Sequence, residues 1–135
     1  MIREISIEKL EIHPDNVRKT YTDIDELAES IKARGVMQNL TVVADPDKDG
    51  YYLVVIGNRR LTAARAAGLK TLPCSIVEMS KKEQISTMLL ENMQRSDLSV
   101  AEQAQGFQLM LDLGETETTI SEKTGFSRST VRHRL

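Results

Sequence analysis

Short apolar runs alternate with amphipathic stretches over the first 80 residues, a pattern typical of a mixed α/β domain. Aliphatic and β-branched residues bounded by turn residues predict strands at 5–12, 40–44, 51–56 and 72–79. The polar segment 45–50 predicts a turn that joins two of these strands as a hairpin. Asp23 and Glu26 have the spacing of a capping box and predict a helix that ends at Gly35.

Beyond residue 80 the apolar residues recur only at helical spacing. They predict one helix over 81–94 and another that begins after Ser99, which has the spacing of a capping box with Glu102. The change near Ser80 therefore predicts an α+β protein. We expect a small mixed α/β domain at 1–80, a connecting helix at 81–98 and an all-α domain at 99–135.

The composition of the 135 residues, 40% hydrophobic and 28% charged, is typical of a soluble globular protein. No apolar stretch is long enough to span a bilayer, and the N-terminus lacks the features of a signal peptide, so no membrane association is evident. The single cysteine, Cys74, lies in an apolar run and cannot form an internal disulfide. A reducing cytoplasm is the expected compartment.

The net charge of −2 argues against a protein that is coated all over with nucleic acid. The charge is unevenly distributed, however. The last sixteen residues carry four cations, Lys123, Arg128, Arg132 and Arg134, against one acid, Glu122. A basic end on an acidic body predicts local contact with a polyanion.

The segment Gly57-Asn58-Arg59-Arg60 stands where a predicted strand passes into a predicted helix at 61–67. Cations are unfavourable at a helix N-terminus by roughly 0.3–1 kcal/mol each, because the macrodipole is positive there. Free N–H groups at the same end bind anions. The strand, the glycine turn and the paired arginines together favour a phosphate-binding site, and an exposed arginine pair without a ligand is the alternative.

Residues 116–135 have the spacing of a helix-turn-helix, in which one short helix ends at Gly125 and Ser127 caps a second. Ile120 and Val131 occupy the positions where the two helices would pack. The second helix would enter the major groove of DNA, and its polar residues would meet bases and phosphates. These are Ser127, Arg128, Ser129, Thr130, Arg132, His133 and Arg134. An ordinary helical hairpin with a solvated basic face is the alternative, and the end of the chain within this helix predicts a fragment.

Taken in order, these segments resemble the boxes of the ParB family of partition proteins. Residues 16–19, Asn-Val-Arg-Lys, are similar to its first box and residues 35–40, Gly-Val-Met-Gln-Asn-Leu, to its second. Residues 57–65 resemble its arginine box and residues 91–98 its fourth box. Four boxes ahead of a helix-turn-helix identify the chain as similar to ParB over nearly its whole length, with a ParB/sulfiredoxin-like first domain.

The resemblance implies a CTP-dependent clamp that loads on double-stranded DNA at a parS-like site, for chromosome or plasmid partition at the nucleoid. Members bind CTP with Mg²⁺, close around DNA as dimers, slide away and reopen on hydrolysis. By position, the implied nucleotide-binding residues are Arg18, Lys19, Val36, Gln38, Leu40, Gly57, Asn58, Arg59 and Arg60. Glu91 and Asn92 are implied to face Mg²⁺, with phosphates and water completing its octahedron. Adjacent helical residues share one site only near a helix end, and an i,i+4 surface pair between Glu91 and Arg95 is the alternative.

The chain departs from the family pattern at three places. Asn58 stands where a glutamate tied to hydrolysis is usual, although Gln38, the other residue associated with hydrolysis, is present. An amide cannot act as a base, so the resemblance favours nucleotide binding and leaves a weak CTPase activity open. Asn39 stands where proline is usual. The basic tail that stimulates the partner ATPase ParA and the C-terminal dimerisation domain are not in this sequence, so a ParA contact is left open.

Other functions remain open at this point. A relative that uses the same switch for gene silencing or nucleoid occlusion has the same boxes. A plain helix-turn-helix repressor would bind DNA without regard to CTP. An enzyme of sulfiredoxin type would need a cysteine in the phosphate loop, whereas Cys74 lies on a predicted strand. A nuclease would need a cluster of acids or histidines around metal, and His13 and His133 are far apart in sequence.

Overall fold

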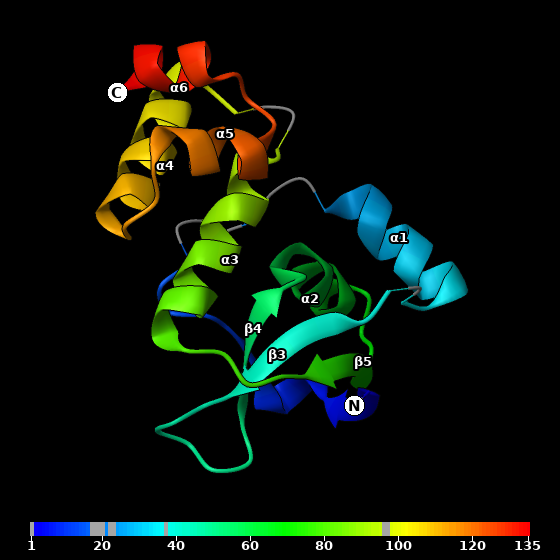
Figure 1. The fold of residues 1–135 in the computed structure, drawn as a ribbon. Helices are drawn as coiled ribbons and strands as arrows, with labels where there is room; N and C mark the ends of the chain where they lie inside the picture. Colours follow the sequence, from blue (N-terminus) through cyan, green and yellow to red (C-terminus); the bar gives the residue numbers. More distant parts are fainter. Residues whose placement is uncertain (1, 17–20, 22–23, 37, 96–97) are drawn as a thin grey trace. The chain divides into compact units, whose positions relative to one another are not determined.

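The computed structural model describes residues 2–16, 21, 24–36, 38–95 and 98–135. The chain divides into two compact units, residues 1–80 and 81–135, and each is described by itself (Figure 1). The first unit is a sheet with two helices, and the second contains only helices among its described residues.

The first unit is built on a mixed sheet of five strands in the order β1-β5-β3-β4-β2. The strands are β1 (Ile2–Ser6), β2 (Leu10–Ile12), β3 (Leu40–Ala44), β4 (Tyr52–Ile56) and β5 (Thr71–Ile76), with a 3₁₀ turn (Ile7–Lys9) between the first two. β3 pairs antiparallel with β4, which confirms the predicted hairpin. β5 pairs parallel with β3 and antiparallel with β1, while β2 pairs parallel with β4.

Two helices, α1 (Asp25–Arg34) and α2 (Asn58–Ala66), pack against each other in this unit. Ile31 of α1 is buried as its helical spacing predicts, and Leu27 is partly buried beside the core. The predicted cap Asp23 lies outside the described residues, and Ile24 occupies the N-cap position. α2 begins three residues earlier than the pattern predicts, so that both arginines lie in its first turn.

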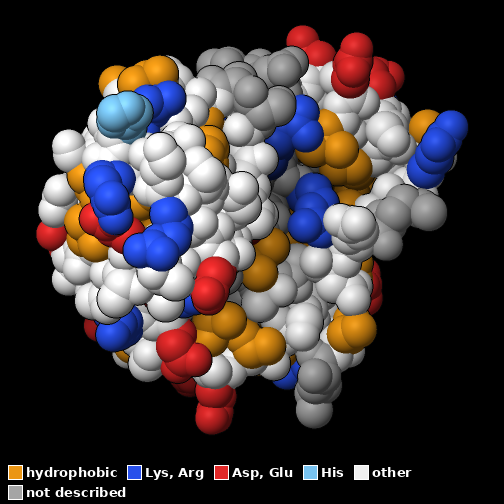
Figure 2. Space-filling view, turned by 45° about the horizontal axis from the view of Figure 1, so that its top comes forward, with side chains coloured by type: hydrophobic (Ala, Val, Ile, Leu, Met, Phe, Trp, Pro, Cys, Tyr) orange, Lys and Arg blue, Asp and Glu red, His pale blue; other side chains and the backbone are white. Residues whose placement is uncertain are grey.

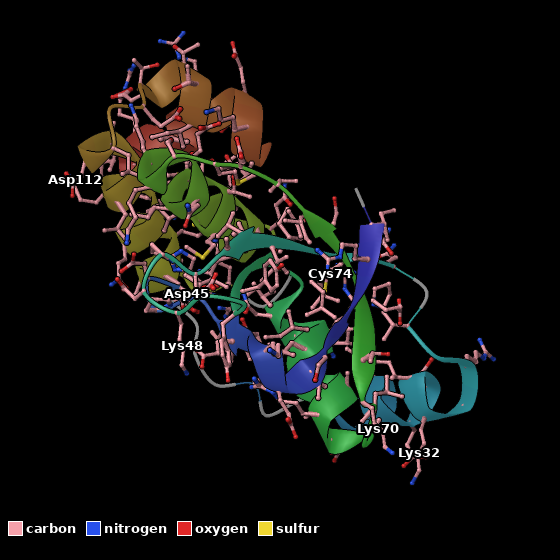
Figure 3. The ribbon with its side chains drawn as sticks, turned by 90° about the horizontal axis from the view of Figure 1, so that it is seen from below. Lys32, Asp45, Lys48, Lys70, Cys74 and Asp112 are labelled. Atoms are coloured by element: carbon pink, nitrogen blue, oxygen red, sulfur yellow. The ribbon has the colours of Figure 1, made fainter. Side chains whose placement is uncertain are left out.

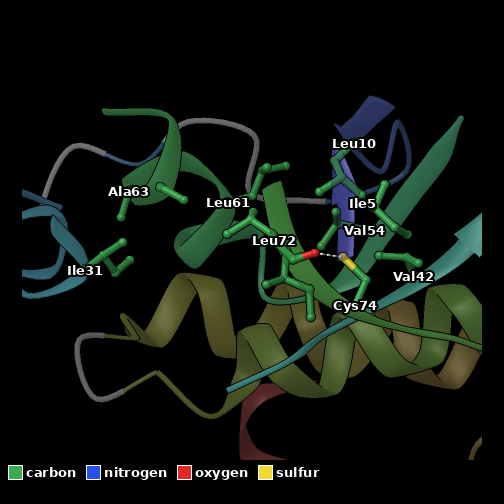
Figure 4. Packing of buried hydrophobic residues seen from close by; sticks show 11 residues of the cluster. Ile5, Leu10, Ile31, Val42, Val54, Leu61, Ala63, Leu72 and Cys74 are labelled. Atoms are coloured by element: carbon green, nitrogen blue, oxygen red, sulfur yellow. Dashed lines mark hydrogen bonds between the residues drawn. The ribbon is translucent and has the colours of Figure 1, made fainter. Parts of the chain in front are cut away.

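The core of the first unit is aliphatic and joins residues of the strands to residues of α1 and α2. Its fully buried members include Leu10, Leu40, Val42, Val54, Leu61, Leu72 and Cys74. Figure 4 shows Ile5, Leu10, Val42 and Val54 gathered around the sulfur of Cys74, which donates a hydrogen bond to the carbonyl of Leu72. Burial raises the pKa of the Cys74 thiol to about 11, and the fully buried side chain is part of the core. Figure 3 shows the same residue among the strands, with Lys32 and Lys70 pointing outward.

The second unit consists of α3 (Lys81–Met93), α4 (Val100–Asp112), α5 (Glu117–Thr124) and α6 (Arg128–Arg134). Its core contains Leu89, Met93, Phe107, Met110, Ile120 and Val131. Phe107 also meets Phe126 edge to face, with ring centroids 5.4 Å apart. Ser99 and Glu102 form the predicted capping box of α4. Gly106 lets α3 and α4 approach, because a Cβ there would overlap the sulfur of Met93.

None of the helices in the described parts of the chain has the length and apolar character needed to cross a membrane.

Candidate functional site

The turn that opens α2 is packed tightly onto β3. Gly57 occupies the N-cap position with φ +104°, a left-handed conformation that favours glycine. An ideal Cβ on Gly57 would lie 3.0 Å from Cγ of Leu40, which is fully buried below it. The structure therefore gives Leu40 a supporting position beneath the turn, instead of the pocket wall expected from the sequence.

Asn58 points into the protein from the first position of α2. Its side chain is 1% exposed, and its Nδ2 donates a hydrogen bond of 3.0 Å to the carbonyl of Val54. Its Oδ1 has no hydrogen-bond partner among the described residues. Asn58 thus ties the helix N-terminus to the end of β4, and its amide acts as a donor where a carboxylate could not.

The two arginines of this turn have different surroundings. Arg59 is exposed, whereas Arg60 is half-buried. Nη1 of Arg60 donates to the carbonyls of Gln38 and Asn39, at 3.1 and 3.0 Å. Arg60 thereby links α2 to the segment before β3, whereas Arg59 is exposed as the alternative of an exposed pair would have it.

A pocket of about 190 Å³ opens beside Arg60. Its lining comes from α1, from the segment after α1 and from α2, namely Leu27, Ser30, Ile31, Gly35, Val36, Gln38 and Arg60. The pocket joins aliphatic walls to a guanidinium near the start of a helix. Such a site suits a ligand with a flat or apolar part and an anionic part.

The structure brings part of the expected nucleotide site together. Val36 and Gln38 line the pocket with Arg60, whereas Gly57, Asn58 and Arg59, which precede Arg60 in the chain, are not part of its lining. Arg18 and Lys19 lie outside the described residues. Leu27 and Ser30 line the pocket without having been predicted, because only the packing of α1 against α2 brings them there. Leu27 stands four residues before Ile31 and three before Ser30, and this helical spacing was the available signal.

The residues expected to face Mg²⁺ lie in the last turn of α3. Glu91 is exposed and Asn92 is half-buried, and α3 ends at Met93, so both lie near a helix end. Oδ1 of Asn92 accepts a hydrogen bond of 3.0 Å from Nη1 of Arg95. Nη2 of Arg95 also pairs with Glu102 at 2.9 Å.

These oxygen donors fit a hard cation chemically. No group of three His, Cys, Asp or Glu side chains in the described part of the chain could hold a metal by itself. Mg²⁺ at Glu91 and Asn92 would therefore depend on further oxygens from a phosphate ligand.

Glu102, the partner of Arg95, is ionised at neutral pH. Hydrogen bonds from Ser99, with the charge of Arg95 as a smaller cause, lower the pKa of the Glu102 carboxyl. Charged groups therefore hold the junction of α3 and α4 at neutral pH.

The two C-terminal helices meet as their sequence predicts. Ile120 of α5 and Val131 of α6 are fully buried, and Oγ of Ser127 accepts a hydrogen bond of 3.1 Å from the backbone N–H of Thr130. A tight turn at Gly125 joins the helices. Ser127 and Thr130 thus contribute to the helix cap.

The basic residues of α6 fall into two groups. Arg128 and His133 are exposed, and their side chains make no hydrogen bond or ion pair with any residue that the structure describes. Ser129 is also exposed. Nε of Arg132 lies 3.2 Å from Oε2 of Glu117 on α5. Nε of Arg134 donates to Oε1 of Gln103 on α4 at 3.0 Å. Figure 2 shows Lys and Arg side chains of the molecule with acidic side chains between them.

Residues 1–93 match the family model described as the ParB N-terminal domain. The chain belongs to the ParB family. The chromosome-partitioning protein ParB of Caulobacter vibrioides is 38% identical over 136 residues, covering 98% of this chain and 45% of that protein. The chromosome-partitioning protein Spo0J of Thermus thermophilus is 39% identical over 125 residues, covering 91% of this chain and 45% of that protein. The chain thus spans about half the length of these curated relatives.

Two solved ParB structures are similar along nearly the whole chain. Truncated ParB of Caulobacter crescentus complexed to the centromeric parS site has a TM-score of 0.83 and 36% identity, covering 98% of this chain and 69% of that one. The same truncated protein complexed with CTP-γ-S has a TM-score of 0.64 and 38% identity, covering 99% and 76%. The ParB relationship therefore extends beyond the N-terminal domain into α4, α5 and α6.

Proposed function

We propose that this chain is the nucleotide-binding and DNA-binding part of a ParB-type partition protein, with CTP as its nucleotide and a parS-like site as its DNA. The pocket beside Arg60 carries the proposal, because it combines an apolar wall, a fixed guanidinium and a helix N-terminus. The complex of a relative with CTP-γ-S supports the choice of nucleotide, and the complex of the same relative with parS supports the DNA partner.

In this proposal the first unit binds the nucleotide in two parts. The nucleoside occupies the pocket lined by Val36 and Gln38, and the phosphates lie at the backbone of Gly57 and Asn58 beside Arg59 and Arg60. The positive end of the α2 dipole and the two arginines would all attract the negative charge of the phosphates. Arg18 and Lys19 are proposed to add to the positive charge near the phosphates. Leu40 contributes by holding the turn from below.

Mg²⁺ would be held by the oxygens of Glu91 and Asn92, together with phosphates and water. When bound, the ion neutralises phosphate charge. Asn92 would use the lone pair of Oδ1 that Arg95 does not occupy, since a carbonyl oxygen has two.

Hydrolysis of the nucleotide is proposed to be weak. Asn58 is buried, and its amide donates to the Val54 carbonyl, so it offers no base to a water molecule. Gln38 is exposed at the pocket and is proposed to orient a water molecule. Orienting water contributes less to hydrolysis than abstracting its proton. The protein would then bind the nucleotide but hydrolyse it only slowly.

The second unit is proposed to act as a helix-turn-helix, with α6 in the major groove. Arg128, Ser129, Arg132 and His133 are exposed residues of α6. Arg128, Ser129 and His133 are the first candidates for contacts with DNA, because Arg132 is paired with Glu117. Loading at the site, closure of a dimer into a clamp and spreading along DNA are proposed for the whole protein, as is an encounter with a ParA-type ATPase.

The test is a calorimetric titration of the chain with CTP, ATP, GTP and UTP in the presence of Mg²⁺, with and without a duplex that carries the Caulobacter parS site. Binding of CTP alone among the four supports the proposal, and the same titration without Mg²⁺ measures what the ion contributes. Absence of binding by every nucleotide, even with the duplex present, would overturn the nucleotide part. Preference for parS over a scrambled duplex tests the DNA part separately.

A further inference from the structure

Glu117, the first residue of α5, places a carboxylate beside the basic residues of α6. Its Oε2 lies 3.2 Å from Nε of Arg132, fifteen residues further along the chain. The side chain of Arg132 is 68% exposed and that of Glu117 is 35% exposed. The pair therefore lies at the surface, where solvent and other ions reach it.

This ion pair lies within the face of α6 that the proposed function assigns to DNA. Val131 is fully buried and fixes which side of the helix points inward. Arg128 and Arg132 are four residues apart and Ser129 and Arg132 three apart, so they are neighbours on the outer surface. An acid held at Arg132 consequently lies next to the residues that would approach the phosphates.

The pair is not needed to hold α5 and α6 together. An exposed ion pair contributes little to stability, because its Coulomb energy is screened and two long side chains lose freedom. Thr116 and Thr119 already satisfy the first turn of α5 through a reciprocal capping box. Ile120 and Val131 provide the buried contact between the helices. The main physical consequence of Glu117 is electrostatic, since it cancels one positive charge on the outer face of α6.

We propose that Glu117 restrains the binding of α6 to DNA by holding Arg132, so that Arg132 reaches a phosphate only after its ion pair breaks. The inference rests on the proposed DNA-binding function. The contact with phosphate carries no sequence information, and its restraint lowers affinity for all duplexes alike. Glu117 thereby limits non-specific binding while the base contacts of other residues are unchanged.

The test compares Glu117→Gln with Glu115→Gln. The second substitution removes the same charge from the same unit and breaks another ion pair, that of Glu115 with Lys123, in which Arg132 takes no part. Affinity for a parS duplex and for a scrambled duplex is measured by fluorescence anisotropy over a range of salt concentrations. For Glu117→Gln we expect about three- to tenfold tighter binding to both duplexes at low salt and a salt slope steeper by about one, as for one added phosphate contact. Glu115→Gln is expected to leave the slope as in the unaltered chain.

A second background identifies the cause of the change. In a chain that carries Arg132→Gln, Glu117→Gln should have little further effect if Glu117 acts through Arg132. A full effect in that background would show direct repulsion of DNA by Glu117 and would overturn the proposal. So would a Glu117→Gln chain that binds both duplexes with unaltered affinity and slope. If the unaltered chain bound neither duplex, the DNA-binding function would fail first, and the restraint with it.

Discussion

The arginines of the two units are held by different kinds of partner. In the first unit, Arg60 is half-buried and donates to two backbone carbonyls that cannot move away independently of the chain. In the second unit, Arg128 is exposed and Arg132 meets a carboxylate on a flexible side chain. The guanidinium of Arg60 is therefore held by the backbone of the first unit, whereas those of Arg128 and Arg132 lie at the surface of the second.

This difference fits the ligands proposed for the two units. A side chain that is already ordered loses little further freedom when a ligand binds, which favours one ligand shape. Exposed arginines can adjust to a run of phosphates, and their contribution to DNA affinity falls as the salt concentration rises. The comparison predicts that changes in the first unit alter selectivity among small ligands, whereas changes in the second alter affinity for polyanions.

The largest effect on stability is expected from a substitution that disrupts the hydrophobic core of one unit and leaves the core of the other intact. Phe107→Ala removes a fully buried ring of the second unit and should lower its stability by about 3–5 kcal/mol. Because each unit has its own core, amides of α4 to α6 should lose protection from hydrogen exchange while those of β3 to β5 keep it. Leu61→Ala in the first core is the matched control and should give the reverse pattern. Loss of protection in both units after either change would contradict independent cores.

Removal of the fixed guanidinium should abolish most nucleotide binding without unfolding the first unit. Arg60→Ala deletes the partner of the Gln38 and Asn39 carbonyls together with the charge at the proposed phosphate site. We expect CTP affinity to fall about 100-fold, or about 2.7 kcal/mol, measured by calorimetry. Arg59→Ala, at an exposed position in the same turn, should cost less because that side chain is not built into the pocket wall. Unchanged CTP affinity in the Arg60 variant would remove this pocket from the proposal.

Features that depend on neighbouring residues could be predicted from the sequence. The hairpin follows from two β-branched runs around a turn, and the α4 cap follows from Ser99 and Glu102. The burial of Ile120 and Val131 follows from helical spacing. In each case the physical cause lies within a few residues of the position itself, so the pattern carries it.

Features that depend on distant backbone atoms could not be predicted. Arg60 donates hydrogen bonds to carbonyls more than twenty residues away. Because every residue has a backbone carbonyl, the sequence does not indicate which of them will accept a hydrogen bond from Arg60. The pocket needs α1 and α2 to meet, which places Ser30 at its wall. Leu40 was expected at the pocket but supports Gly57 from the core, because the register of β3 turns its side chain inward. The partners of Arg132 and Arg134 likewise follow from tertiary packing alone.

A smaller effect is expected where an arginine is free to meet DNA. Arg128→Ala should weaken binding to parS by about 1–3 kcal/mol if Arg128 contacts a base, with a smaller loss on a scrambled duplex. Arg134→Gln is the control, because Arg134 is half-buried and tied to Gln103 on α4. It should leave the salt slope nearly unchanged and affect mainly the stability of the second unit. An equal loss on all sequences would reassign Arg128 to a phosphate contact.

The smallest effect concerns the response of the second unit to acid. A hydrogen bond from Lys123, followed by one from Thr119, lowers the pKa of the Glu115 carboxyl. A lowered pKa in the folded state stabilises the unit at pH values above the unfolded value of about 4.3, and this contribution is lost as the pH falls through the folded value. Glu115→Gln should therefore reduce the loss of stability of the second unit below about pH 4.3, by less than about 1 kcal/mol, because the side chain of Lys123 is 45% exposed and solvent screens the pair. The melting temperature measured over a range of pH values checks this. Glu122→Gln, on α5, controls for the loss of one negative charge. An unchanged dependence of stability on pH below about 4.3 in the Glu115 variant would show that the ion pair with Lys123 adds nothing to stability.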